Sequence, residues 1–241
     1  MFRKIASSRR EFLRRLGGFS LGLSATSVLV TGCTQTKSSG STRNNQALNA
    51  DQALQELMEG NKRYVASKPT RPDQTAEYRI EVAKGQHPFA VIVGCSDSRV
   101  PPEIVFDQGL GDLFVIRVAG NVVDNEALGS IEYAAEEFKV PLVVVLGHER
   151  CGAVKATIDA IEKGGEVPGH IKSLVDAIRP SVEKAKEQTG DLLDNAVRAN
   201  VARVVGQLKA SGPILSEFAH AGKLRIVGAR YDLDTGAVES L

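Results

Sequence analysis

The sequence predicts a single α/β domain built on a mostly parallel β-sheet with helices on its flanks. Four β-rich runs, at residues 89–93, 113–118, 142–146 and 224–229, alternate with helical patterns, and three of the runs are continuously apolar. Continuous apolar runs are typical of parallel strands covered on both faces, and strand–helix alternation is typical of parallel crossovers. We therefore expect four core strands in one domain.

The remaining elements follow from apolar spacing and turn residues. Asp51 is a candidate cap for a first helix whose apolar side carries Leu54, Leu57, Met58 and Val65. The other expected helices span residues 76–83, 125–138, 153–161, 171–186 and 192–209. Residues 231–236, which read Tyr-Asp-Leu-Asp-Thr-Gly, predict a turn into a short return strand.

Composition excludes some classes of function. The chain has 241 residues, of which 42% are hydrophobic and 24% charged, as in ordinary globular proteins. Residues 1–32 hold six of the 30 basic residues and one of the 29 acidic ones, so the rest of the chain is mildly acidic. We therefore expect no nucleic-acid partner. Three cysteines are too few for a disulfide scaffold.

The first 33 residues predict an export signal. Arg9 and Arg10 precede an apolar pair and resemble the twin-arginine signal, and the apolar stretch at 16–30 is short for a membrane span. Residues 30–33, Val-Thr-Gly-Cys, resemble a lipobox, in which cleavage would leave Cys33 as the lipidated residue. A plain signal peptide, an uncleaved anchor and an amphipathic helix remain alternatives.

This interpretation divides the chain into three parts. Residues 1–33 are the signal, residues 34–50, rich in Ser, Thr and Asn, are a flexible tether, and residues 51–241 are the folded domain. We expect a periplasmic or otherwise extracytoplasmic protein, held to a membrane only through a lipid on Cys33.

Two polar clusters directly follow predicted strands. Cys95, Asp97 and Arg99 follow the first strand, and His148 and Cys151 follow the third. Open α/β sheets bind ligands at the carboxyl ends of their strands. Two thiolates and an imidazole are suitable ligands for tetrahedral zinc, and three protein ligands leave a fourth position for water, as in catalytic zinc sites.

These clusters resemble the signature of the β-class carbonic anhydrases, C-x-D-S-R followed by H-x-x-C. The surrounding sequence agrees over roughly residues 50–241. The agreement includes Gln86, Val100-Pro101, residues 114–121, residues 131–134 and Gly152. Together these motifs are far more specific than H-x-x-C alone.

The resemblance implies reversible hydration of carbon dioxide to bicarbonate and a proton, with one zinc ion per chain held by Cys95, His148 and Cys151. Zinc-bound hydroxide would attack carbon dioxide. Asp97 would accept the hydrogen bond of the hydroxide, and Arg99 would keep Asp97 ionised. Two thiolates neutralise the charge of Zn²⁺, so we expect the activity to rise with pH through a midpoint above the ≈ 7 typical of three-histidine sites.

The resemblance also implies a substrate pocket at a dimer interface. Gln86 would donate to a substrate oxygen, Phe114 and Tyr133 would shape an apolar pocket, and Gly152 would offer its backbone N–H. The working unit would be a homodimer or a dimer of dimers. Some family members close the site by bringing the counterpart of Asp97 onto zinc as a fourth ligand. Family members that bind bicarbonate as an inhibitor commonly have tryptophan where Ile92 stands, so we expect an open site here.

Other interpretations remain open at this stage. Cys95 and Cys151 could form a disulfide, and Asp97 with Arg99 could be a surface ion pair. The same fold and zinc ligands also serve hydrolases of carbon disulfide or carbonyl sulfide. A catalytically silent zinc-binding lipoprotein is a further alternative.

Overall fold

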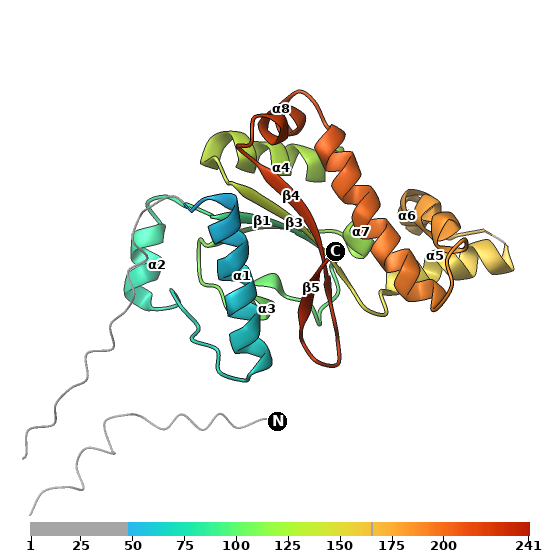
Figure 1. The fold of residues 1–241 in the computed structure, drawn as a ribbon, viewed down its shortest axis with the longest axis horizontal. Helices are drawn as coiled ribbons and strands as arrows, with labels where there is room; N and C mark the ends of the chain where they lie inside the picture. The colour runs from blue at the N-terminus through green and yellow to red at the C-terminus, as the bar shows by residue number, and fades with distance from the viewer. Residues whose placement is uncertain (1–47, 165) are drawn as a thin grey trace, which may run out of the picture. The chain divides into compact units, whose positions relative to one another are not determined.

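The computed structural model describes residues 48–164 and 166–241. A five-stranded sheet with the order β2-β1-β3-β4-β5 forms its centre (Figure 1). The strands are β1 Ala90–Gly94, β2 Leu113–Arg117, β3 Leu142–His148, β4 Arg225–Tyr231 and β5 Val238–Ser240. The first four are parallel and β5 runs antiparallel to β4, which confirms the expected sheet and its return strand. The predicted signal, Cys33 and nearly all of the tether lie outside the described residues.

Five of the helices agree with the sequence prediction to within about three residues at each end. The helices are α1 Ala50–Val65, α2 Ala76–Val82, α3 Pro102–Val105, α4 Asn125–Phe138, α5 Gly152–Lys163, α6 Ile171–Ala185, α7 Leu192–Ala210 and α8 Ile214–His220, with a 3₁₀ turn, η2, at Ala119–Asn121. The prediction missed α3, η2 and α8, because such short segments carry too little apolar periodicity to be recognised.

The start of α1 corrects the predicted cap. Asn49, and not Asp51, is the N-cap: its side chain accepts from the backbone N–H of Gln52, whose side chain accepts in turn from the backbone N–H of Asn49, both at 2.9 Å. This reciprocal pair is a capping box. Asp51 lies in the first turn and forms an ion pair with Arg225. Val65, at the last position of α1, is 45% exposed and does not belong to the buried side.

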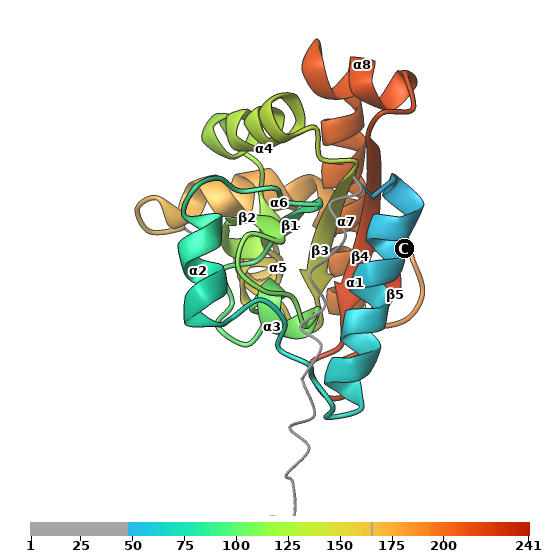
Figure 2. The same cartoon turned by 90° about the vertical axis from the view of Figure 1, so that its left-hand side faces the viewer.

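The sheet is covered on both faces, as its apolar strands predicted. On one face, Val91, Val93 and Val143 pack against residues of α4, α7 and α8. On the other face, Ile92 and Val144 pack against residues of α1 and α3. Figures 1 and 2 show the resulting three layers. Among the residues that the structure describes, no helix is long and apolar enough to cross a membrane.

A third apolar cluster lies beside the carboxyl ends of the strands. It joins residues of α5, α6 and α7, including Val154, Ile178 and Val197, with Cys95 and Cys151. Figure 1 shows α5 and α6 side by side at this end of the molecule, next to the beginning of α7. The predicted metal ligands are therefore built into an apolar core and not into an exposed loop.

Candidate metal centre

Strand register brings the two polar clusters together. β1 and β3 are neighbours with Gly94 opposite Leu146, so Cys95, directly after β1, lies beside the end of β3 at His148. Cys151 is the N-cap of α5. The ligand atoms of Cys95, His148 and Cys151 all lie within 4.8 Å of one another, and the three residues are buried. The group could therefore hold one metal ion.

The imidazole of His148 is oriented for a metal. Its Nδ1 lies 2.9 Å from the carbonyl oxygen of Glu149. A carbonyl can only accept, so Nδ1 carries the proton and Nε2 presents its lone pair. Nε2 is buried, and it is one of the few buried side-chain atoms in the described part of the chain without a hydrogen-bond partner. Such an orphaned atom beside two thiols fits a zinc ion.

The pKa values of the two thiols are shifted in opposite directions. A hydrogen bond from Cys151, together with one from the backbone N–H of Gly120, lowers the pKa of Cys95 to about 4 against the effect of burial. The same pairing, together with burial, raises the pKa of Cys151. The pKa of His148 is raised by the neighbouring Cys95 sulfur, although burial alone would lower it. The low pKa of Cys95 favours the thiolate, the form of cysteine that ligates metals.

Cys95 and Cys151 are both free cysteines in the structure and do not form the disulfide considered as an alternative. The sulfur of Cys95 accepts a hydrogen bond from the backbone N–H of Gly120 at 3.2 Å. Bonds of this kind orient a metal ligand and tune its charge.

Arg117 holds the segment that follows β1 in place. Its Nε donates to the carbonyl of Cys95 at 2.8 Å, and its Nη2 donates to the carbonyl of Asp97. Neither Arg117 nor Gly120 was predicted to support the metal site. The sequence carried a signal for Arg117, because this residue lies near the carboxyl end of the expected strand at 113–118, the sheet edge where ligands bind.

Asp97 and Arg99 form a bidentate pair beside the cluster. Nε of Arg99 donates to Oδ1 of Asp97 at 2.9 Å and Nη2 donates to Oδ2 at 2.8 Å. These bonds hold the pKa of Asp97 well below its usual range. Oδ2 of Asp97 also lies 3.8 Å from Nε2 of His148, so an ionised carboxylate faces the place that a metal would occupy.

The structure separates the other predicted site residues. Gly152 is the first residue of α5, next to Cys151. Gln86 is exposed in the loop before β1, at the opposite end of that strand from Cys95. Phe114 lies within β2, and its ring centroid is 6.4 Å from that of Tyr133 on α4. Within one chain, Gly152 is thus near the metal ligands, whereas Gln86 is not.

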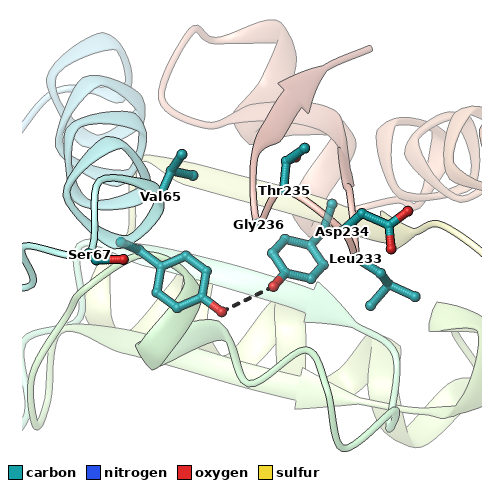
Figure 3. Close-up of a pocket in the computed structure, with 8 residues that line it drawn as sticks. Val65, Ser67, Leu233, Asp234, Thr235 and Gly236 are labelled. Atoms are coloured by element: carbon teal, nitrogen blue, oxygen red, sulfur yellow. Dashed lines mark hydrogen bonds between the residues drawn. The ribbon is translucent and has the colours of Figure 1, made fainter.

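A separate hollow of about 270 Å³ lies between the end of α1 and the turn before β5 (Figure 3). The hydroxyls of Tyr64 and Tyr231 face each other there at 3.2 Å, shown by the dashed line. Val65, Asp234 and Thr235 contribute to its lining. None of the residues that line it is a predicted site residue, so the hollow is not the expected substrate pocket.

The fold is that of a known enzyme class. The family model described as carbonic anhydrase matches residues 90–238. The chain therefore belongs to the carbonic anhydrase family, and its mostly parallel sheet and its relatives place it in the β class.

Particular relatives agree with this assignment. The chain is 46% identical to carbonic anhydrase 2 of Mycobacterium tuberculosis over 184 residues, which cover 76% of this chain and 89% of that protein. It is 44% identical to the carbonic anhydrase of Mycolicibacterium smegmatis over 187 residues, 78% of this chain and 91% of that one. The Coccomyxa β-carbonic anhydrase, solved in complex with acetazolamide, matches with a TM-score of 0.61 and 29% identity, over 78% of this chain and 86% of that one. The protein is thus a carbonic anhydrase.

Proposed function

We propose that this carbonic anhydrase works outside the cytoplasm with one zinc ion per chain, held by Cys95, His148 and Cys151. The observation that carries the zinc site is the orphaned, buried Nε2 of His148 beside two free thiols. The β-carbonic anhydrases are zinc enzymes, and this donor set suits zinc. The substrates are carbon dioxide and water, and the products are bicarbonate and a proton.

Bound zinc supplies a Lewis acid that makes hydroxide available near neutral pH. Asp97 accepts the hydrogen bond of the attacking oxygen and thereby directs a lone pair of that oxygen toward carbon dioxide. It can do so because Arg99 keeps it ionised. Gly152 is the first residue of α5, where backbone N–H groups have no partner within the helix, so its N–H is available to a substrate oxygen.

The substrate pocket requires a second copy of the chain. β2 is an edge strand whose only partner among the described strands is β1, and all of its residues are partly exposed. Tyr133, which flanks β2 from α4, is 53% exposed. A two-fold contact along β2 would set the two β2 strands antiparallel. The amino end of one sheet would then face the carboxyl end of the other.

That arrangement would bring together, from two protomers, the site residues that lie apart within one chain. Gln86 of one protomer, at the amino end of β1, would approach the metal ligands of its partner, and Phe114 and Tyr133 would line the space between the protomers. We propose a homodimer as the smallest working unit, with a dimer of dimers as the larger form. A structural relative from Sordaria macrospora, 23% identical with a TM-score of 0.60 over 78% of this chain and 96% of that one, is described as tetrameric.

The proposed location rests on residues 1–33 alone. Twin-arginine export carries folded proteins, so zinc could be loaded before export, and a lipid on Cys33 would hold the enzyme at a membrane surface. Metabolic labelling with radioactive palmitate tests the anchor. Label on the wild-type chain and none on Cys33→Ser supports lipidation, and an unlabelled wild-type chain contradicts it.

Stopped-flow hydration of carbon dioxide, with zinc quantified in the same sample, tests the catalytic proposal. We expect about one zinc per chain, loss of zinc in Cys95→Ser, and loss of hydration but not of zinc in Asp97→Asn. Asp234→Asn is the matched control, because Asp234 forms a similar bidentate pair with Arg150 at 2.7 and 3.0 Å on an exposed turn. Zinc without hydration would favour a hydrolase of sulfur analogues or a binding role. A Cys95–Cys151 disulfide in place of zinc would refute the proposal.

A further inference from the structure

The N–H that bonds Cys95 comes from a residue with an unusual conformation. Gly120 has φ 68° and ψ 22°, in the left-handed region that favours glycine. A Cβ at this position would lie 2.6 Å from Cδ1 of Ile178 and 3.1 Å from Cβ of Ala153. Gly120 therefore fits closely beneath α5 and α6, but its backbone dihedrals are intrinsically free. Something other than its own side chain has to hold its N–H on the sulfur.

Asn200 on α7 meets that requirement. Its Nδ2 donates to the carbonyl of Gly120 at 2.8 Å, and the residue is only 1% exposed. The next backbone N–H, that of Asn121, donates to the carbonyl of Val118 at 2.8 Å. The peptide between Gly120 and Asn121 is therefore held at both ends, which fixes ψ of Gly120.

The orientation of the Asn200 amide is itself determined. Nε of Arg203 donates to Oγ of Ser181 at 3.2 Å, and an arginine can only donate. The carbonyl of Gly120 can only accept, so Nδ2 of Asn200 faces Gly120 and Oδ1 faces Ser181. The Ser181 hydroxyl donates to this Oδ1, also at 3.2 Å. Ser181 and Asn200 are both buried, so water does not replace these bonds.

We propose that Asn200 is a positioning residue of the metal site, which holds Gly120 so that its N–H stays on the sulfur of Cys95. The inference rests on the proposed zinc site. A hydrogen bond to a ligating thiolate withdraws charge from the sulfur and restricts its direction. Without Asn200, only the bond from Asn121 to Val118 restrains the peptide after Gly120. The N–H of Gly120 is then less firmly held on the sulfur, which carries more charge and is less well placed.

Zinc affinity and the spectrum of the cobalt-substituted protein test this proposal on the purified full-length chain. Asn200→Ala is expected to lower zinc affinity, measured by chelator competition, by about tenfold. In the Co²⁺ form, its sulfur-to-cobalt charge-transfer band is expected to move to lower energy, because a thiolate without the N–H bond gives up an electron more readily. Ser181→Ala should change both quantities in the same direction but less, because it releases only the orientation of the amide.

Gln207→Ala is the matched control. Gln207 lies two turns further along α7, and its side-chain amide donates to the carbonyl of Val123 at 3.1 Å, beyond the glycine turn. The Gln207→Ala variant should leave the zinc affinity and the spectrum of the Co²⁺ form unchanged. Wild-type values in both Asn200→Ala and Ser181→Ala would overturn the inference, as would equal changes in Gln207→Ala. If Asn200→Ala does not fold by circular dichroism, Ser181→Ala decides. If the inference about Asn200 fails but the wild-type chain binds zinc and hydrates carbon dioxide, the proposed function still stands. A wild-type chain that binds no zinc would overturn both the inference and the proposed function.

Discussion

The guanidinium of Arg99 and the carboxylate of Asp97 face each other through two parallel hydrogen bonds, and the backbone N–H of Arg99 donates a third at 2.9 Å. The side chain of Arg99 is 54% exposed and that of Asp97 is 16% exposed. The arginine thus shields the carboxylate from one side and leaves its Oδ2 facing His148. Bidentate charge-assisted pairs of this kind combine charge with a fixed direction.

Replacing Arg99 by Met should impair hydration and change its pH dependence. The arginine keeps the pKa of Asp97 low, and burial acts in the opposite direction, so its loss raises that pKa. Asp97 would then become protonated at a higher pH, and hydration would fail earlier as the pH is lowered. We expect a loss of about tenfold or more in kcat/KM near neutral pH, since misdirected groups are costly. Stopped-flow pH profiles measure both effects.

Arg225→Met is the control for that experiment. Arg225 also forms an ion pair with an aspartate, Asp51, but at the amino end of β4, the edge of the sheet opposite the candidate metal site. We expect its pH profile to match that of the wild type. An unchanged acid limb in Arg99→Met, or an equal change in Arg225→Met, would contradict the role given to Arg99.

The hydration rate itself should rise with pH through a midpoint above 7. The two proposed cysteine ligands would neutralise the charge of Zn²⁺, so the site would acidify water less than three neutral histidines do. A kcat/KM profile that is flat between about pH 6 and 9 would contradict this account.

Gly60 and Gly129 both lie inside helices, yet alanine should have opposite effects at the two positions. A Cβ on Gly60 would lie 1.7 Å from the carbonyl oxygen of Phe106, whereas one on Gly129 would meet nothing within 4 Å. Gly60→Ala should therefore destabilise the protein by about 3 kcal/mol. Gly129→Ala should stabilise it by about 0.5–1 kcal/mol, because alanine favours helices. Urea unfolding measures both, and a gain in Gly60→Ala would show that α1 is not packed as described.

Asp107 should contribute stability that is lost in acid. Its side chain is 1% exposed and accepts from Arg63 at 2.6 Å and from Thr70 and Arg71 at 2.9 Å. Burial opposes ionisation, but these donors hold the pKa of Asp107 below its ordinary value of 3.8. The stabilisation is therefore complete above about pH 4 and disappears as the pH falls through the depressed pKa.

Asp107→Asn should lower the free energy of unfolding by about 3 kcal/mol at pH 7, and the difference from wild type should shrink below pH 4. Asp176→Asn removes an exposed helical pair with Lys172 and should cost nothing measurable. A constant difference between Asp107→Asn and wild type from pH 7 to pH 3 would contradict this role.

The proposed dimer predicts a specific sensitivity at the β2 edge. Tyr133→Glu places a charge beside the exposed edge strand and should shift the protein toward monomers, with loss of hydration. Ile171→Glu on α6 is the control, because Ile171 is exposed to a similar extent, 51% against 53%. Sedimentation velocity measures the assembly. A Tyr133→Glu dimer that remains intact and active would argue against an interface along β2.

The parts of this protein that were predictable from sequence are those with strong local patterns. The apolar runs predicted β1 and β3, and the polar residues directly after them predicted a cluster that the structure does bring together, because the strand register places Cys95 beside His148. The support around these ligands was not predictable. Asn200 reaches Gly120 across 80 positions of sequence, and the turn that receives it has only three residues. Such contacts arise from packing between helices and leave no periodic signal.

The pairing of Gly94 with Leu146 also makes the metal site a reporter of folding. A slip of one residue between β1 and β3 would shift Cys95 by about 3.3 Å along the strand and move its neighbours to the opposite face of the sheet. The donors would then no longer converge. If the proposed zinc site is correct, the zinc content of a preparation therefore reports the fraction of molecules in which β1 and β3 are aligned in the native register.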